Sequence, residues 1–217
     1  MEKQERHGSY RVITDAGCGE IVEKKSRFIA SLMPVGSEEE ALAFIASVRR
    51  KYYDARHNCF AFITGEDGET ERCSDDGEPS GSAGRPMLEV LRGMGLTNTA
   101  AVVTRYFGGT LLGTGGLVRA YTQAVQAALE NCTVITMHSG VRFYVTIDYA
   151  LTGKLQHLFA ERQIMTEDTV YTDKVRYQII VPYGQEEAFQ KELTELTAAQ
   201  VWIEKAGTVY YQGRGTE

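Results

Sequence analysis

Four arginines lie within or just before a segment of the chain that has no acidic side chains. Residues 93–129 contain no carboxylate, and their ionisable cations are Arg105 and Arg119, while Arg85 and Arg92 come just before. A buried arginine needs a partner, because leaving its charge unpaired costs about 3–5 kcal/mol. The segment therefore predicts either a network of ion pairs or a binding site for an anion.

Two kinds of partner for these arginines are open. The first is internal: the loop after residue 74 contains Asp75, Asp76 and Glu78, which would form a structural network with arginine. The second is external: an anion such as phosphate would lie against a glycine-rich turn and the N-terminus of the next helix, where free N–H groups point outward. Both could hold, because a charge network also orders loops that bind ligands.

The residues that we predict to contact an anion or a nucleic acid come from three segments of this region. They are Arg85, Arg105, Tyr106, Phe107, Gly108, Gly109, Gly113, Gly115, Gly116 and Arg119. Tyr106 and Phe107 could stack on nucleic-acid bases, or they could close a strand in the core. The glycine run fits neither a P-loop nor a G-x-G-x-x-G motif, so it indicates no nucleotide class.

The neighbouring residues leave room for other chemistry. Asp75, Asp76 and Glu78 would orient the arginines, and as oxygen ligands they could bind Mg²⁺ or Mn²⁺, although acidic residues in such loops more often form turns. His57 and Cys59 share a strand face about 7 Å apart, as in a nucleophile pair or in simple core packing. The sequence contains no zinc-ligand cluster and no Ser-His-Asp motif, and we assign no catalytic residue, metal or cofactor.

The composition indicates a globular protein with a core of its own. The chain has 217 residues, of which 43% are hydrophobic and 24% charged, and its net charge is −6. No apolar run reaches the ~18 residues that a membrane helix needs, and the start lacks the apolar stretch of a secretory signal. We therefore expect a cytoplasmic protein without membrane contact. The negative charge counts mildly against tight non-specific binding to RNA.

Hydrophobic periodicity predicts an α+β protein with two domains, the first covering residues 1–135. There, Ser37 and Glu40 form a capping box that starts a helix, and Asp67-Gly68 predicts a two-residue hairpin turn. A strand at 58–66 is apolar on both faces and is predicted to be central. Other strands are expected at residues 10–24, 27–35, 69–75 and 99–107, and helices at 37–52, 85–94 and after the glycine run.

The second domain, residues 136–217, has a different order of elements. The sequence predicts strand, helix, strand, strand, helix and strand at residues 141–149, 152–162, 164–171, 174–181, 185–197 and 200–211. This βαββαβ order is typical of a ferredoxin-like domain.

Four motifs carry a resemblance to a known family. They are KSRF at residues 25–28, DGEPSGSAGRP at 76–86, VTRYFGGTLLG at 103–113 and GGLVRAY at 115–121. In these motifs the chain resembles the IMPACT/YigZ family. The resemblance implies a first domain like those of a small-subunit ribosomal protein, domain IV of elongation factor G and GHMP kinases. It also implies a last domain like domain V of elongation factor G.

The resemblance also shapes the functional expectation. Eukaryotic relatives regulate translation by competing for the activator of a kinase that phosphorylates an initiation factor, and they carry an RWD domain that this chain lacks. Nucleic-acid or ribosome binding is the usual inference for bacterial relatives. We therefore expect a non-enzymatic regulator in translation or RNA metabolism that binds RNA, the ribosome or another anion. Two alternatives stay open: a metal-dependent hydrolase or phosphoryl-substrate enzyme using the acidic loop, and a regulator that binds a translation-related protein.

Overall fold

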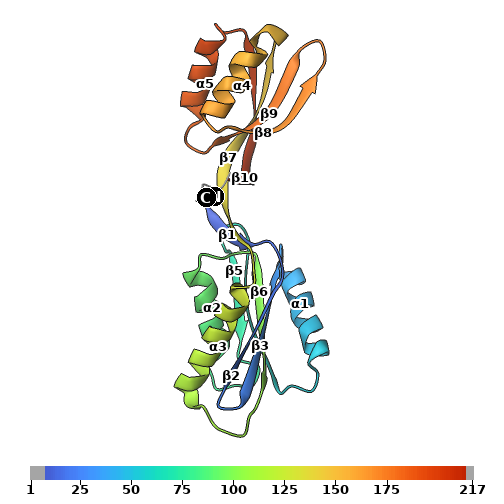
Figure 1. The fold of residues 1–217 in the computed structure, drawn as a ribbon, viewed down its shortest axis with the longest axis vertical. Coiled ribbons are helices and arrows are strands. Elements are labelled where there is room, and N and C mark those ends of the chain that lie inside the picture. Colours follow the sequence, from blue (N-terminus) through green and yellow to red (C-terminus); the bar gives the residue numbers. More distant parts are fainter. Residues whose placement is uncertain (1–7, 214–217) are drawn as a thin grey trace, which may run out of the picture. The chain divides into compact units, whose positions relative to one another are not determined.

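A computed structural model describes residues 8–213 of the chain (Figure 1). The contacts within it divide the chain into a first unit, Tyr10–Thr136, and a second unit that begins at Met137 and also includes residues 8–9. The sequence predicted the boundary after residue 135, one residue earlier. Each unit mixes helices and strands, so the protein is α+β.

The first unit is built on an antiparallel sheet with the strand order β2-β3-β6-β4-β5. Its strands are β2 (Gly17–Glu23), β3 (Ser26–Pro34), β4 (His57–Thr64), β5 (Thr70–Ser74) and β6 (Thr99–Tyr106), and β1 (Tyr10–Ile13) precedes them. Every residue of β6 from Thr99 to Arg105 is buried, because helices cover both faces of the sheet.

One face of this sheet is covered by α1 (Glu38–Lys51), which connects β3 to β4. Half of the predicted capping box is present, since the backbone N–H of Glu40 donates to the hydroxyl of the N-cap Ser37 at 3.2 Å. The Glu40 carboxylate accepts at 2.7 Å from the N–H of Gly36, one residue before the N-cap. Since β3 and β4 each pair antiparallel with β6, they run parallel to each other with β6 between them.

The other face is covered by α2 (Gly84–Gly93) and α3 (Gly113–Leu129) (Figure 1). Cys59, Ala61 and Ile63 of β4 pack toward these two helices, while Phe62 packs toward α1. The prediction that this strand is apolar on both faces and central is therefore confirmed.

Two local predictions in this unit are wrong. The strand expected at residues 10–24 is interrupted at residues 14–16. The hairpin between β4 and β5 has a five-residue loop, residues 65–69, instead of a two-residue turn. The reason is that Gly65 leaves the sheet, since its N–H donates to the side-chain oxygen of Asn98 at 2.9 Å and its carbonyl accepts from the Thr97 hydroxyl.

The second unit has the predicted βαββαβ order. It consists of β7 (Val134–Ile147), whose first residues belong to the first unit, a short 3-10 helix (Tyr149–Leu151), α4 (Thr152–Glu161), β8 (Met165–Tyr171), β9 (Val175–Pro182), α5 (Glu186–Leu196) and β10 (Val201–Gln212). The antiparallel strand order β10-β7-β9-β8 is that of a ferredoxin-like domain.

The core of the second unit lies on one side of its sheet. Val141, Phe143 and Val145 of β7 pack against Leu155 of α4 and Phe189 of α5. Because side chains alternate along a strand, the residues between them point to the opposite face, which α4 and α5 do not cover. None of the helices among residues 8–213 has the length and apolar character needed to cross a membrane.

Candidate functional site

Arg105 is buried near the end of β6, and its partner is internal. Its Nη1 lies 2.7 Å from Oε1 of Glu78, and the two side chains are 7% and 3% exposed. The hydroxyl of Tyr121, on α3, donates to the same oxygen at 2.8 Å. The guanidinium carbon lies 5.3 Å from the ring centre of Phe28 and 5.6 Å from that of Phe107. The pair therefore ties β6 to the acidic loop and to α3.

The contacts of Arg105 indicate a structural role for this side chain. The Nε of Arg105 is buried without a hydrogen-bond partner within residues 8–213, while Nη1 donates to Oε1 of Glu78, which also accepts from Tyr121. A buried ion pair adds little net stability, but removing one partner leaves an uncompensated charge. Arg105 therefore holds the start of the glycine-rich loop in place.

Asp75 stabilises the turn that leads into α2. Its carboxylate accepts hydrogen bonds from the N–H groups of Gly81, Ala83 and Gly84 at 2.8, 3.0 and 2.9 Å. Burial alone would raise the pKa of Asp75, but these three backbone donors outweigh it and hold the pKa below its usual value. Asp75 thus acts as a cap for the first N–H groups of the helix.

Asp76 faces a different set of partners. One carboxylate oxygen lies 2.8 Å from Nη2 of Arg49, and the other accepts from the N–H of Asn58 at 2.7 Å. The backbone carbonyl of Asp76 lies 2.9 Å from Nδ1 of His57. Asp75, Asp76 and Glu78 of the acidic loop therefore each contact a different set of partners. Residues 8–213 contain no group of three side chains placed to hold a metal ion.

Cys59 is part of the same buried network. Its thiol lies 2.9 Å from the carbonyl oxygen of Asp75 and 3.3 Å from the hydroxyl of Tyr121. Burial raises the pKa of this thiol to about 12. Because the thiolate is the nucleophilic form, this raised pKa disfavours a nucleophilic role for Cys59 at neutral pH. The ring of His57 contacts the backbone carbonyl of Asp76.

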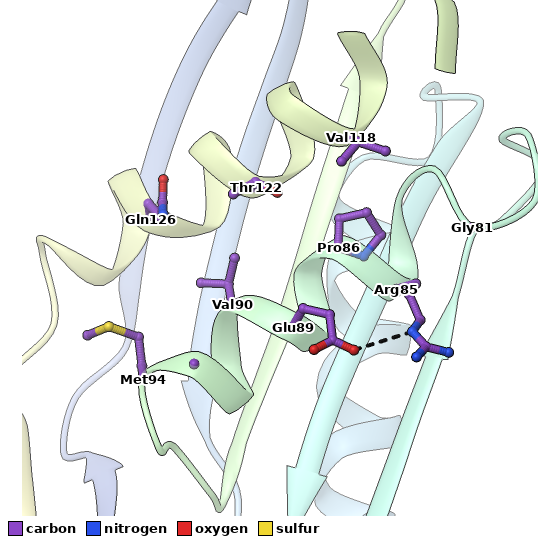
Figure 2. A pocket seen from close by; sticks show the side chains of 10 residues that line it. Gly81, Arg85, Pro86, Glu89, Val90, Met94, Val118, Thr122 and Gln126 are labelled. Carbon is purple, nitrogen blue, oxygen red and sulfur yellow. Dashed lines mark hydrogen bonds and ion pairs between the residues drawn. The ribbon is translucent and has the colours of Figure 1, made fainter. Parts of the chain in front are cut away.

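The structure does not bring Arg85, Arg105 and Arg119 to one point. Arg85 is exposed in the first turn of α2, and its Nε lies 3.3 Å from Glu89 of the same helix. Figure 2 shows this pair at the rim of a groove of about 620 Å³ between α2 and α3. Arg119 is exposed on α3 and makes no ion pair with any described residue. The acidic loop orients only Arg105 of the three.

The glycine-rich loop holds a close contact at its start and is open at its end. The N–H of Gly108 donates to the Ser26 hydroxyl at 3.1 Å, and a Cβ on Gly108 would lie only 2.0 Å from the carbonyl carbon of Lys25. Gly109 and Gly113 have φ of +87° and +70°, a conformation that favours glycine. No side chain lies within 4 Å of the space beside Gly115.

The N-terminus of α3 is therefore suited to an anion. Its N-cap residue is Leu112, which offers no capping side chain, and its first turn contains no acidic residue. Tyr106 and Phe107, which precede the loop, differ in accessibility. The hydroxyl of Tyr106 donates to Asp54 at 2.7 Å, and the guanidinium of Arg27 lies over its ring. Phe107 remains 53% exposed.

Several exposed cations lie at this end of the first unit, and of these the sequence predicted only Arg119 as a contact for an anion. We call Lys24, Lys25, Arg50, Arg56 and Arg119 the basic end. The β2–β3 turn, the C-terminus of α1 and the start of α3 lie at the same end of the unit in Figure 1. All five side chains are exposed, and none makes an ion pair within residues 8–213. The Arg49-Arg50-Lys51 run could have indicated them, but a helix C-terminus also favours cations.

The register of the sheet explains why these cations come together. Arg27 pairs with Tyr106, and His57 pairs with Arg105, so the starts of β3 and β4 flank the end of β6. Lys25 and Arg56 immediately precede those two strands. The exposed ring of Tyr53, 86% accessible, belongs to the connection between α1 and β4.

Comparison with known proteins connects this geometry to a family. Residues 24–129 match the Impact N-terminal domain, and residues 145–200 match a domain of unknown function, DUF1949. The chain is 39% identical over 204 residues to the IMPACT family member YvyE of Bacillus subtilis, covering 94% of each protein. The chain belongs to the IMPACT family.

Other members and one solved structure agree with this assignment. The chain is 36% identical to the IMPACT family member YigZ of Escherichia coli over 83% of this chain and 89% of that protein. The Protein IMPACT of Mus musculus is 35% identical over 98 residues, which cover 43% of this chain and 30% of that protein. A crystal structure of a hypothetical protein is 33% identical in sequence and superimposes with a TM-score of 0.58. The match covers 90% of this chain and 96% of that protein.

The match to the Impact N-terminal domain contains the whole candidate site. Residues 24–129 begin at the β2–β3 turn and end with α3, so they include the Arg105 network, the glycine-rich loop and every cation of the basic end.

Proposed function

We propose that this IMPACT family member is a non-enzymatic, cytoplasmic binding protein whose basic end contacts the phosphates of RNA, and that it acts in translation or RNA metabolism. The observation that carries the proposal is the group of exposed cations that form no ion pair within residues 8–213, beside a glycine-rich helix N-terminus whose N-cap residue is Leu112. Exposed cations and free backbone N–H groups are the two features that proteins use to bind phosphate.

The internal network supports this role by shaping the loop. Arg105 contacts the ring of Phe107, and Gly108 bonds to Ser26, so the first residues of the glycine-rich loop are held against the β2–β3 turn. We propose that the loop presents its backbone N–H groups, while Lys25, Arg56 and Arg119 contribute the charge. In this proposal Arg105 is a positioning residue.

The enzyme alternative receives less support. The acidic loop uses Asp75, Asp76 and Glu78 for three separate structural contacts, and the raised pKa of Cys59 disfavours a nucleophilic thiol. An acid/base or metal role needs a carboxylate that is free to meet substrate or metal.

The test is the salt dependence of RNA binding. We expect the full chain to bind a fluorescently labelled single-stranded RNA, with an affinity that falls as salt rises and a log–log slope of about −0.7 per phosphate contacted. The variant Lys25→Gln/Arg56→Gln should lose about 1.4 units of that slope. Fluorescence anisotropy at several salt concentrations measures both quantities.

A matched variant controls for net charge. Lys154→Gln/Lys191→Gln also removes two positive charges, but from exposed positions on α4 and α5. Its salt slope for RNA binding should equal that of the wild type. Equal slopes for all three proteins would contradict the proposal. So would an affinity that does not change with salt, or no binding at about 50 mM salt.

A further inference from the structure

The open face of the second unit's sheet carries an unusual group of exposed side chains. The strand alternation that sends Phe143 and Val145 into the core sends Tyr144 to the open face. Trp202, on β10, is 71% exposed and is the only tryptophan of the chain. An exposed tryptophan leaves a large apolar ring in water, so its position calls for an explanation.

The strand register places further groups beside these rings. Thr146 of β7 pairs with Trp202 of β10 on one side and with Arg176 of β9 on the other. The Cα atoms of Trp202 and Arg176 are therefore about 10 Å apart, which is two strand spacings. The guanidinium carbon of Arg176 lies 4.1 Å from the ring centre of Tyr144. The open face thus presents an indole, a phenol and a guanidinium plane across three neighbouring strands.

A shallow pocket lies within the same face. It has a volume of about 200 Å³ and is lined by Tyr144, Asp168, Val170, Arg176 and Gln178. Its walls therefore combine apolar surface with a carboxylate acceptor, an amide and a guanidinium donor. Flat rings beside mixed donors and acceptors suit an unpaired nucleobase, which stacks through its face and forms hydrogen bonds through its edge.

Both arginines of this face pair with carboxylates of the protein, while the carboxylate of Asp168, which lines the pocket, makes no ion pair within residues 8–213. Arg142 forms two hydrogen bonds with Glu167 at 2.6 and 2.7 Å, and Arg176 lies 3.6 Å from Glu204. The face therefore lacks the unpaired cations of the basic end, and phosphate neutralisation contributes little here. Stacking is the interaction that it offers.

We infer that the open face of the second unit's sheet binds bases of single-stranded RNA, with Trp202 as the main stacking residue. Exposed aromatic side chains on a four-stranded sheet backed by two helices are a general means of stacking single-stranded RNA bases. The inference goes beyond the proposed function, because it concerns the other unit and the bases, whereas the basic end concerns phosphates.

Trp202 itself provides the measurement. Because it is the only tryptophan, its fluorescence in the full chain reports on this face alone. We expect a ten-nucleotide single-stranded RNA to quench the fluorescence in a saturable way. Trp202→Ala should weaken binding roughly 5- to 150-fold, the range found when one stacking aromatic is removed. Trp202→Phe should retain most of the affinity.

A control and a second variant separate the outcomes. Tyr171→Ala removes another exposed ring of the second unit and should leave affinity unchanged. Lys25→Gln/Arg56→Gln should lower the salt slope while leaving the quenching at saturation intact. RNA binding seen by anisotropy without quenching, or equal affinities for Trp202→Ala and wild type, would overturn this inference alone. Quenching with a salt slope that Lys25→Gln/Arg56→Gln does not change would overturn the proposed function alone.

Discussion

Two sets of cations lie at the same end of the first unit, and the fold treats them in opposite ways. Arg105 is 7% exposed, lies between two aromatic rings and is paired with Glu78. The cations of the basic end are exposed and make no ion pair within the described residues. The difference shows that a carboxylate of the protein neutralises the buried charge of Arg105, whereas the exposed cations of the basic end remain available to bind an anion.

The largest effect should come from breaking the buried pair. Glu78→Ala leaves Arg105 buried and unpaired, so we expect the free energy of unfolding to fall by about 3–5 kcal/mol, measured by urea denaturation. Glu89→Ala, which removes an exposed partner shared by Arg85 and Arg92, should change it by about 1 kcal/mol or less. The double variant Glu78→Leu/Arg105→Met should recover much of the loss. A small effect of Glu78→Ala would contradict the structural role of the pair.

The next effect should appear where the glycine-rich loop touches the β2–β3 turn. A methyl group at Gly108 would meet the backbone of Lys25, so we expect Gly108→Ala to destabilise the protein by about 1–3 kcal/mol. Gly115→Ala meets open space at the first turn of α3 and should leave stability unchanged or slightly higher. Thermal melts of the two variants give the comparison. Equal destabilisation would show that the contact at Gly108 does not hold the loop.

The interior of the network should also respond to alkaline pH. Burial raises the pKa of Cys59 to about 12 from an ordinary value of 9.0. The stabilisation linked to the protonated thiol is therefore complete below about pH 9 and is lost as the pH rises toward 12, at most about 1.4 kcal/mol per pH unit. Cys59→Ala should flatten this alkaline decline in urea denaturation. If Cys59→Ala loses stability at alkaline pH as steeply as the wild type, a group other than Cys59 causes that loss.

The smallest effect on stability should come from the basic end. Arg119→Gln removes an exposed cation that forms no ion pair with residues 8–213, so the free energy of unfolding should stay within about 0.5 kcal/mol of the wild type. Its salt slope for RNA binding should nevertheless drop by about 0.7. A loss of stability without a change in slope would make Arg119 a structural residue and would remove it from the basic end.

Much of the fold follows from local pattern. The N-cap at Ser37, the strand at 58–66 with two apolar faces and the βαββαβ order of the second unit all depend on nearest neighbours along the chain. Local pattern is less reliable on α5, where Ala188, Phe189, Leu193 and Leu196 are apolar at helical spacing but only Phe189 and Leu193 are buried. On this helix only Phe189 and Leu193, four residues apart, pack into the core of the second unit.

The site was harder to predict, because it depends on long-range placement. The sequence offered three carboxylates for Arg105 and could not choose among them. Asp75 bonds to backbone N–H groups and Asp76 pairs with Arg49 and with the N–H of Asn58, which leaves Glu78 as the partner. Likewise, Lys25 and Arg56 are 31 residues apart in the chain, and they flank β6 only through the strand register.

The most direct test of the central claim is a map of backbone amide shifts during RNA titration. With ¹⁵N-labelled full chain and a single-stranded RNA, we predict the largest shifts at the amides of Gly109, Gly113, Gly115 and Gly116, accompanied by those of Lys24 and Lys25. RNA binding that leaves these amides unshifted would contradict a phosphate site at the glycine-rich loop and the basic end.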